Sequence, residues 1–135
     1  VNDYQILEKE WREKLEQAEI YASKGDIENI LESLKDYIDI EDKRIKIGQL
    51  IRSAYLQQIL SLLAKRFKGE KIDDNLFENA FKSYIRLFGY DIEISDLIEK
   101  AKKLKIDVNV SGISEGDITK WHRYKLPARI WENLE

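Results

Sequence analysis

Cysteine is absent from the 135 residues of this chain. Its absence excludes disulfides, thiolate metal sites and iron–sulfur clusters that are held by cysteine. The chain also has only one histidine, and no catalytic triad, glycine-rich phosphate loop, paired-carboxylate motif or metal-ligand spacing stands out. These absences predict a non-catalytic binding protein without a cofactor, rather than an enzyme.

Long hydrophobic runs are missing as well. No apolar run approaches the roughly 20 residues that a membrane-spanning helix needs, and no signal-peptide pattern is visible. We therefore expect a cytoplasmic protein that makes no membrane contact. The hydrophobic content of 43% and the charged content of 36% are typical of a soluble globular protein, and the length suits one domain over residues 1–135.

Acidic residues are absent between Asp42 and Glu70, although the net charge of the chain is −3. Residues 1–42 contain 13 acidic and 5 basic side chains, whereas the rest of the chain contains 13 acidic and 18 basic ones. The basic side chains are concentrated at Lys43–Lys68 and Lys120–Arg129. This asymmetry indicates either an anionic ligand on the basic part or mutual neutralisation of the two parts in the fold.

The acid-free stretch predicts the element around which the fold is built. Its middle, residues 50–63, is apolar around most of a helical circumference, which is typical of a buried helix. We predict a central helix over Lys43–Phe67 with Asp42 as its N-cap.

Four residues of this helix form the first candidate site. Arg44, Gly48 and Arg52 follow one another at a spacing of four residues, and Tyr55 comes three residues later. This spacing places them on one face. A phosphate could bind Arg44 together with the free N–H groups of the helix N-terminus. The alternative is a solvated basic face on which Gly48 admits a neighbouring helix.

Helical periodicity predicts five further helices in a mainly α, compact domain. They span Asp3–Ala22, Ile27–Ile38 with Asp26 as N-cap, Asn75–Phe88, Asp96–Leu104 with Ser95 as N-cap, and Ala128–Leu134. The apolar stripe of the first runs through Tyr4, Leu7, Trp11, Leu15, Ala18, Tyr21 and Ala22, and the inner face of the Asn75–Phe88 helix begins with Leu76 and Phe77. Alternation of polar and apolar residues over Lys105–Val110 predicts a short strand near the C-terminus, followed by a loop.

The run from Lys120 to Lys125 is the second candidate site. Trp121 and Tyr124 offer stacking surfaces that contribute about 1–3 kcal/mol per base. His122, Arg123 and Lys125 are side chains that contact phosphates. The alternative is amphipathic packing, with the two aromatic side chains in the core and the cations outside.

The two candidate sites together carry a resemblance to a known family. Arg44, Gly48 and Arg52-Ser53-Ala54-Tyr55, followed by an apolar helix, resemble the nucleotide-binding helix in the C-terminal domain of the large primase subunit. Glu115–Pro127 resembles the late segment of that domain, where a Glu-Gly pair and a basic, aromatic loop precede the last cluster cysteine. This chain lacks the cluster cysteines, and the combination resembles the PriX family of small, non-catalytic primase subunits in some archaea. The resemblance covers roughly residues 40–130.

The resemblance implies a function in DNA replication. It implies that the chain binds the initiating nucleotide triphosphate and supports RNA primer synthesis, while a separate subunit polymerises. The implied partners are the primase catalytic and large subunits in a heterotrimer, with template DNA as a further candidate. The nucleotide-binding residues implied by the resemblance and the motifs are Arg44, Arg52, Tyr55, Trp121, His122, Arg123 and Lys125.

Two other classes of function stay open. A helical RNA-binding small subunit of a CRISPR effector complex would present a flat basic stripe, here Lys43, Lys46, Arg52 and Lys82. A purely structural adaptor would bury Trp121 and Tyr124 and dock a partner through its acidic N-terminal part. A pocket formed by Arg44, Arg52 and the Lys120–Lys125 run favours the primase subunit.

Overall fold

The computed structural model describes residues 3–109, and every regular element in that part of the chain is helical. The elements are α1 (Asp3–Ser23), α2 (Ile27–Leu34), the short 3₁₀ helix η1 (Lys35–Tyr37), α3 (Glu41–Phe67), α4 (Asp74–Phe88) and α5 (Ile92–Lys103). The prediction of a mainly α protein is therefore confirmed for this part. The predicted helix Ala128–Leu134 lies outside the described residues, and none of the described helices is long and apolar enough to span a membrane.

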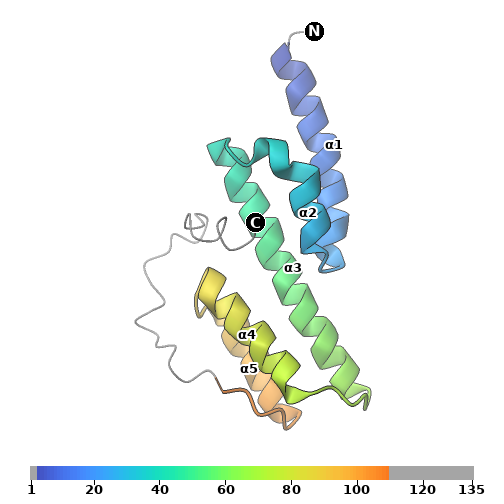
Figure 1. The fold of residues 1–135 in the computed structure, drawn as a ribbon, viewed down its shortest axis with the longest axis vertical. Coiled ribbons are helices and arrows are strands. Elements are labelled where there is room, and N and C mark those ends of the chain that lie inside the picture. Colours follow the sequence, from blue (N-terminus) through green and yellow to red (C-terminus); the bar gives the residue numbers. More distant parts are fainter. Residues whose placement is uncertain (1–2, 110–135) are drawn as a thin grey trace.

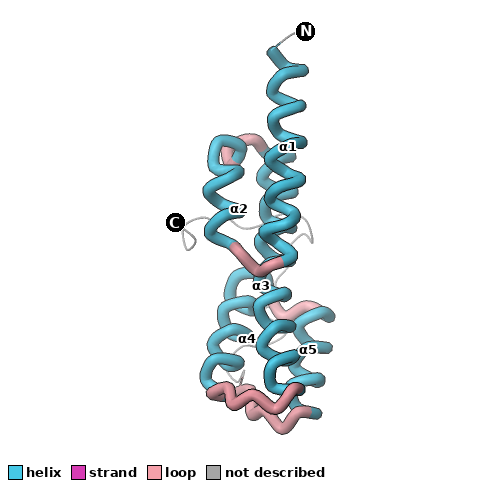
Figure 2. Tube along the Cα trace, turned by 90° about the vertical axis from the view of Figure 1, so that its right-hand side faces the viewer, coloured by secondary structure: helices cyan, strands magenta, loops and turns pink. Residues whose placement is uncertain are grey.

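The long helix α3 is shared by two sets of shorter helices (Figure 1). α1 and α2 pack against each other and against α3, and α4 and α5 do the same with α3. Figure 2 shows the same division, with α1 and α2 towards one end of α3 and α4 and α5 towards the other. The prediction of a central helix is thus confirmed. It is not enclosed on all sides, because Ser53 and Leu60 are exposed.

The core consists of the apolar stripes that face α3. The largest side chains with essentially no exposed surface are Tyr84, Phe77, Phe81, Ile30, Leu34, Ile47, Ile51, Ile59, Ile94 and Ile106. Burial of one such side chain stabilises the fold by about 1.5–3 kcal/mol relative to leaving it in water. Trp11 is buried as predicted, but Leu76 is exposed. The prediction that Leu76 lies on the inner face is wrong, because adjacent helical residues differ by about 100° in direction and only Phe77 turns towards the core.

The helix starts are set by acidic side chains. Asp26 caps α2 as predicted, since its side chain accepts a hydrogen bond from the N–H of Asn29. Asp73 caps α4 in the same way. The prediction for α3 is wrong by two residues, because Ile40 is the N-cap, without a side-chain hydrogen bond, and Asp42 lies inside the first turn.

Two other predicted boundaries are wrong. α5 begins at Ile92 after the N-cap Asp91, whose Oδ1 accepts from the N–H of Ile94 at 2.9 Å, so Ser95 is not the cap. The predicted helix Ile27–Ile38 ends at Leu34 and continues only as η1. The tighter turn of η1 leads the chain to the start of α3.

The predicted strand does not form within the described residues. Residues 105–109 are in no strand, and Val110 lies outside the described part. Ile106 is buried, and its N–H donates to the carbonyl of Ala101 at 3.0 Å. The alternation of polar and apolar residues therefore reflects burial of Ile106 at the end of α5, rather than pairing with another strand.

The turn between α1 and α2 provides a test of how closely these helices approach α3. Gly25 has φ +71°, and a Cβ there would lie 2.9 Å from Gln58 Cγ. Gly69 has φ +88°, and a Cβ there would meet no atom within 4 Å. We expect Gly25→Ala to lower the free energy of unfolding by about 2–4 kcal/mol and Gly69→Ala by about 1–2 kcal/mol, because only the first adds a clash to the backbone strain. Urea unfolding followed by circular dichroism measures both, and equal losses would contradict a close approach at Gly25.

Candidate functional site

Three of the residues predicted to bind nucleotide lie in the described part, and all three are on α3. They are Arg44, Arg52 and Tyr55. The other four lie outside the described residues, namely Trp121, His122, Arg123 and Lys125. The structure therefore describes the geometry of the candidate site for its three residues on α3.

Arg44 is anchored at the start of α3. Its Nε donates to the carbonyl oxygen of Ile38 at 2.7 Å, and its Nη2 lies 3.8 Å from Asp39 Oδ1. Both partners belong to the turn that joins η1 to α3, and 41% of the Arg44 side chain is exposed. The backbone thus fixes one nitrogen of the guanidinium, and the side chain as a whole is partly exposed.

Arg52 is held where α3 crosses the start of α5. Its Nε and Nη2 donate to Asp91 Oδ2 at 3.3 and 3.0 Å, and Nη2 also lies 3.0 Å from Glu93 Oε2. The guanidinium carbon is 5.9 Å from the centroid of the Tyr84 ring, within the range of a cation–π contact. The Arg52 side chain is 31% exposed. It is therefore oriented by one aromatic ring and two carboxylates.

The electrostatics of this cluster keep Arg52 charged and Tyr84 neutral. Burial lowers the pKa of Arg52, but Tyr84, Asp91 and Glu93 together outweigh it, so the pKa lies above its usual value. Burial also raises the pKa of the Tyr84 phenol, and the hydrogen bond that this phenol donates to Asp91 Oδ2 adds to the rise. At neutral pH, Asp91 thus receives donors from both Arg52 and Tyr84.

Tyr55 lies on the same side of the structure as Arg52. Its ring meets Phe88 edge to face with centroids 5.6 Å apart, and Phe88 in turn lies 5.0 Å from Tyr84. Burial raises the pKa of Tyr55, and the charge of Arg86 opposes the rise. Arg52 and Tyr55 are therefore linked through two aromatic rings of α4. The contacts of Arg44 given above are to a different segment, and eight helical residues separate it from Arg52 by about 12 Å.

Sequence reasoning missed the residues that surround Arg52. The sequence patterns predict Asp91 and Glu93 in a short connection and Tyr84 in the core, although an aspartate three residues before Ile94 is an N-cap signal. Their presence changes the chemistry of the site, because an anion must compete with two carboxylates for Arg52. Within residues 3–109 no group of three or more histidine, aspartate or glutamate side chains is placed to hold a metal ion.

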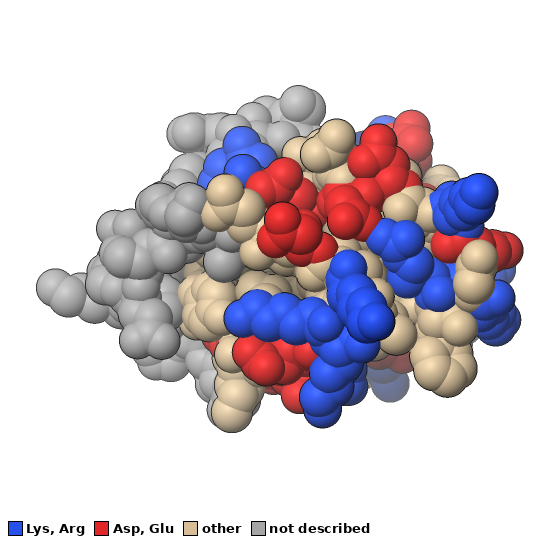
Figure 3. All heavy atoms as spheres, turned by 90° about the horizontal axis from the view of Figure 1, so that it is seen from below, with Lys and Arg blue, Asp and Glu red and all other residues tan. Residues whose placement is uncertain are grey.

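The basic stripe that would favour RNA coating is largely neutralised. Lys43 Nζ lies 2.9 Å from Glu8 Oε1, and Lys82 Nζ lies 3.4 Å from Glu78 Oε1. Arg52 is paired as described above, so three of the four stripe cations have carboxylate partners. Figure 3 shows the lower end of the molecule, where acidic and basic side chains are likewise interspersed. The described part therefore offers little support for a continuous basic surface.

Comparisons of this chain with known protein families, with curated proteins and with solved structures find no match. The case for any function therefore depends on the residues themselves and on the resemblance of their motifs.

The carboxylate of Asp91 provides a test of this cluster. We expect Asp91→Ala to lower the free energy of unfolding at neutral pH by about 2–3 kcal/mol, because it removes the cap of α5 and the partner of two donors. Asp96→Ala is the matched control on the same helix, since Asp96 makes one exposed ion pair with Lys100, and it should cost less than about 1 kcal/mol. Chemical denaturation measures both, and similar losses would show that Asp91 does not organise the cluster.

The raised pKa of Tyr84 predicts a loss of stability in alkaline solution. The folded state retains the phenolic proton above the ordinary pKa of 10.0, whereas the unfolded chain releases it. The stabilisation is therefore complete below that pH and is lost as the pH rises above it. Between about pH 9 and pH 11 we expect the wild type to lose about 1 kcal/mol more than Tyr84→Phe. Tyr4→Phe, at an exposed tyrosine, serves as the control and should follow the wild type in urea unfolding at each pH.

Proposed function

We propose that this chain is a non-catalytic, nucleotide-binding subunit of a primase complex. It binds the initiating nucleotide triphosphate through α3 and supports the synthesis of RNA primers during DNA replication. The observation that carries the proposal is the pair of arginines on α3, which contains no acidic residue after Asp42. Arg44 and Arg52 are each anchored by hydrogen bonds, and their side chains are 41% and 31% exposed.

Anchored arginines are well suited to phosphate. The planar guanidinium matches two phosphate oxygens at once, which a lysine cannot do. Because each side chain is already oriented, binding costs less rotamer entropy than it would for a free surface arginine. These features support a phosphate-binding role for this helix.

The carboxylates beside Arg52 support selectivity for a triphosphate. Without a ligand, Asp91 and Glu93 neutralise the guanidinium, so a weakly charged anion gains little by replacing them. A triphosphate carries more negative charge and competes better for the same donors. Asp91 is needed by α5 and by Tyr84, so Glu93 is the carboxylate that the ligand displaces. The site thus favours triphosphate over monophosphate.

The remaining parts of the proposal come from the resemblance. Tyr55, Trp121, His122, Arg123 and Lys125 complete the nucleotide site, with the aromatic rings beside the base and the cations beside the phosphates. The primase catalytic and large subunits are the partners, and template DNA is a further ligand of the assembled complex. Polymerisation is the task of the catalytic partner.

Titration with ATP, AMP and a short single-stranded DNA tests the proposal. We expect ATP to bind more tightly than AMP, and Arg52→Ala to weaken ATP binding by about ten-fold or more, as the loss of a charge-assisted contact should. Glu93→Gln should tighten ATP binding several-fold, because it removes the competitor and keeps the side-chain shape. Arg12→Ala, which removes an exposed arginine of α1, is the matched control and should leave binding unchanged.

The gain of affinity in Glu93→Gln separates a ligand-binding arginine from a structural one, because a structural ion pair would only lose stability. Circular dichroism of each variant verifies that the fold is retained. The same titration is repeated with the catalytic and large subunits present, since a composite site would bind nucleotide only in their presence. Absence of a triphosphate preference in both settings, together with no effect of Arg52→Ala, would contradict the proposal.

A further inference from the structure

The apolar stripe of α1 continues beyond the part that packs in the core. Trp11 and Ala18 are buried, whereas Tyr4 and Leu7, at the N-terminal end of the same stripe, are 70% and 55% exposed. The first turns of α1 project past α2 and past the turn before α3 (Figure 1). Amphipathic helices place such stripes against a partner. Within the described residues, this end of the stripe is largely uncovered.

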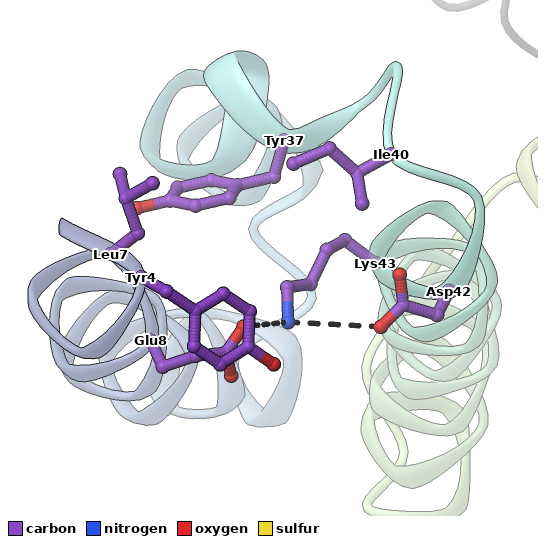
Figure 4. Close-up of a pocket in the computed structure, with 7 residues that line it drawn as sticks. All are labelled: Tyr4, Leu7, Glu8, Tyr37, Ile40, Asp42 and Lys43. Carbon is purple, nitrogen blue, oxygen red and sulfur yellow. Dashed lines mark hydrogen bonds and ion pairs between the residues drawn. The ribbon is translucent and has the colours of Figure 1, made fainter. Parts of the chain in front are cut away.

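A cavity of about 260 Å³ lies beneath these exposed side chains. Its apolar walls are Tyr4 and Leu7 from α1 and Tyr37 and Ile40 from the segment before α3. Figure 4 shows Tyr37 and Ile40 on one side and Tyr4 on the other, with the side chain of Lys43 between them. The cavity is thus an apolar notch between α1 and the start of α3.

One wall of the notch is a fixed ion pair. Lys43 Nζ lies 2.9 Å from Glu8 Oε1 and 3.7 Å from Asp42 Oδ2, and it also lies 5.0 Å from the centroid of the Trp11 ring. The hydrogen bond with Glu8 raises the pKa of Lys43 despite its burial. These contacts tie α1 to α3, so the two walls of the notch are held at a set distance from each other.

The size of the notch selects the kind of occupant. Small-molecule sites generally have volumes of about 300–1,000 Å³ and bury most of their ligand. A notch of about 260 Å³ with exposed apolar rims is smaller than that range. It suits one or two apolar side chains that project from a partner, as in complexes where a helix docks in a groove.

The surroundings of the notch are acidic. Glu8 and Asp42 line it and are paired with Lys43, whereas Asp36 and Asp39 on the adjoining segment are 73% and 101% exposed and, among the described residues, make only long ion pairs, 4.0 Å with Lys14 and 3.8 Å with Arg44. Residues 1–42 as a whole hold 13 acidic and only 5 basic side chains. A partner with lysines or arginines beside its apolar anchor would therefore gain complementary charge, whereas an acidic partner would be repelled.

We infer that this notch is a docking site for a basic amphipathic helix of a partner protein. One apolar side chain of that helix packs against Tyr37 and Ile40, a second packs on Leu7, and its basic residues face the exposed carboxylates of Asp36 and Asp39. This docking does not require nucleotide binding. A test that contradicts the function proposed above would therefore leave the docking inference unaffected. A second copy of this chain is a poor occupant, because a symmetric contact would bring two acidic surfaces together.

Fluorescence anisotropy with the full chain tests the inference. The probe is a labelled peptide of leucine and lysine with its leucines at helical spacing. Leu7→Asp is the test variant, and Leu76→Asp on α4 is the matched control, because the two leucines are 55% and 53% exposed and both changes add the same charge. We expect Leu7→Asp to weaken binding about ten-fold, as for a central apolar anchor, and Leu76→Asp to leave it unchanged or slightly tighter.

The added charge alone would favour a basic peptide, so weaker binding by Leu7→Asp reports the lost apolar contact. A peptide with alanine in place of leucine should bind about ten-fold more weakly to the wild type. Equal binding by both variants, or equal binding of a leucine and glutamate peptide, would overturn the inference. A dimer in sedimentation that disappears in Leu7→Asp would also overturn it, because the notch would then hold a second copy. Neither substituted leucine is in the core, and circular dichroism verifies the fold of both variants.

Discussion

One carboxylate connects three helices of this protein through hydrogen bonds. Asp91 Oδ1 caps α5, while Oδ2 accepts hydrogen bonds from Arg52 of α3 and Tyr84 of α4. A carboxylate withdrawn from water is costly unless its lone pairs are satisfied, and here the satisfying donors come from three separate elements. The position of α5 and the presentation of the Arg52 guanidinium therefore depend on the same side chain. A ligand that binds Arg52 would therefore also affect the contacts of Asp91 that join α3, α4 and α5.

Local sequence patterns predicted most of the fold, because each helix has a strong pattern of its own. The periodic burial of Phe77, Phe81 and Tyr84 and the capping chemistry of Asp26 are both contained in a few neighbouring residues. The start of α5 was not predictable in this way. Asp91 and Ser95 are both good N-caps, and the choice between them is made by donors on α3 and α4.

Local sequence patterns also predicted only part of the candidate site. Helical spacing correctly placed Arg44, Arg52 and Tyr55 on one helix, but it could not reveal what neutralises them. The partner carboxylate of Arg52 is 39 residues away in the sequence, and that of Lys43 is 35 residues away. Such pairs arise only when helices pack. The exposed end of the α1 stripe has a similar origin, since the periodicity cannot tell how far the neighbouring helices reach.

The sharing of α3 between two sets of helices has a consequence for how the chain acquires its shape. The main packing contacts join each helix to its neighbour or next neighbour in the chain, and such local connectivity favours rapid folding. Helices α1, α2 and α3 are all present once residue 67 has been made. The α1–α2–α3 unit can therefore assemble during synthesis, before α4 and α5 emerge, and can serve as the template on which the second set condenses.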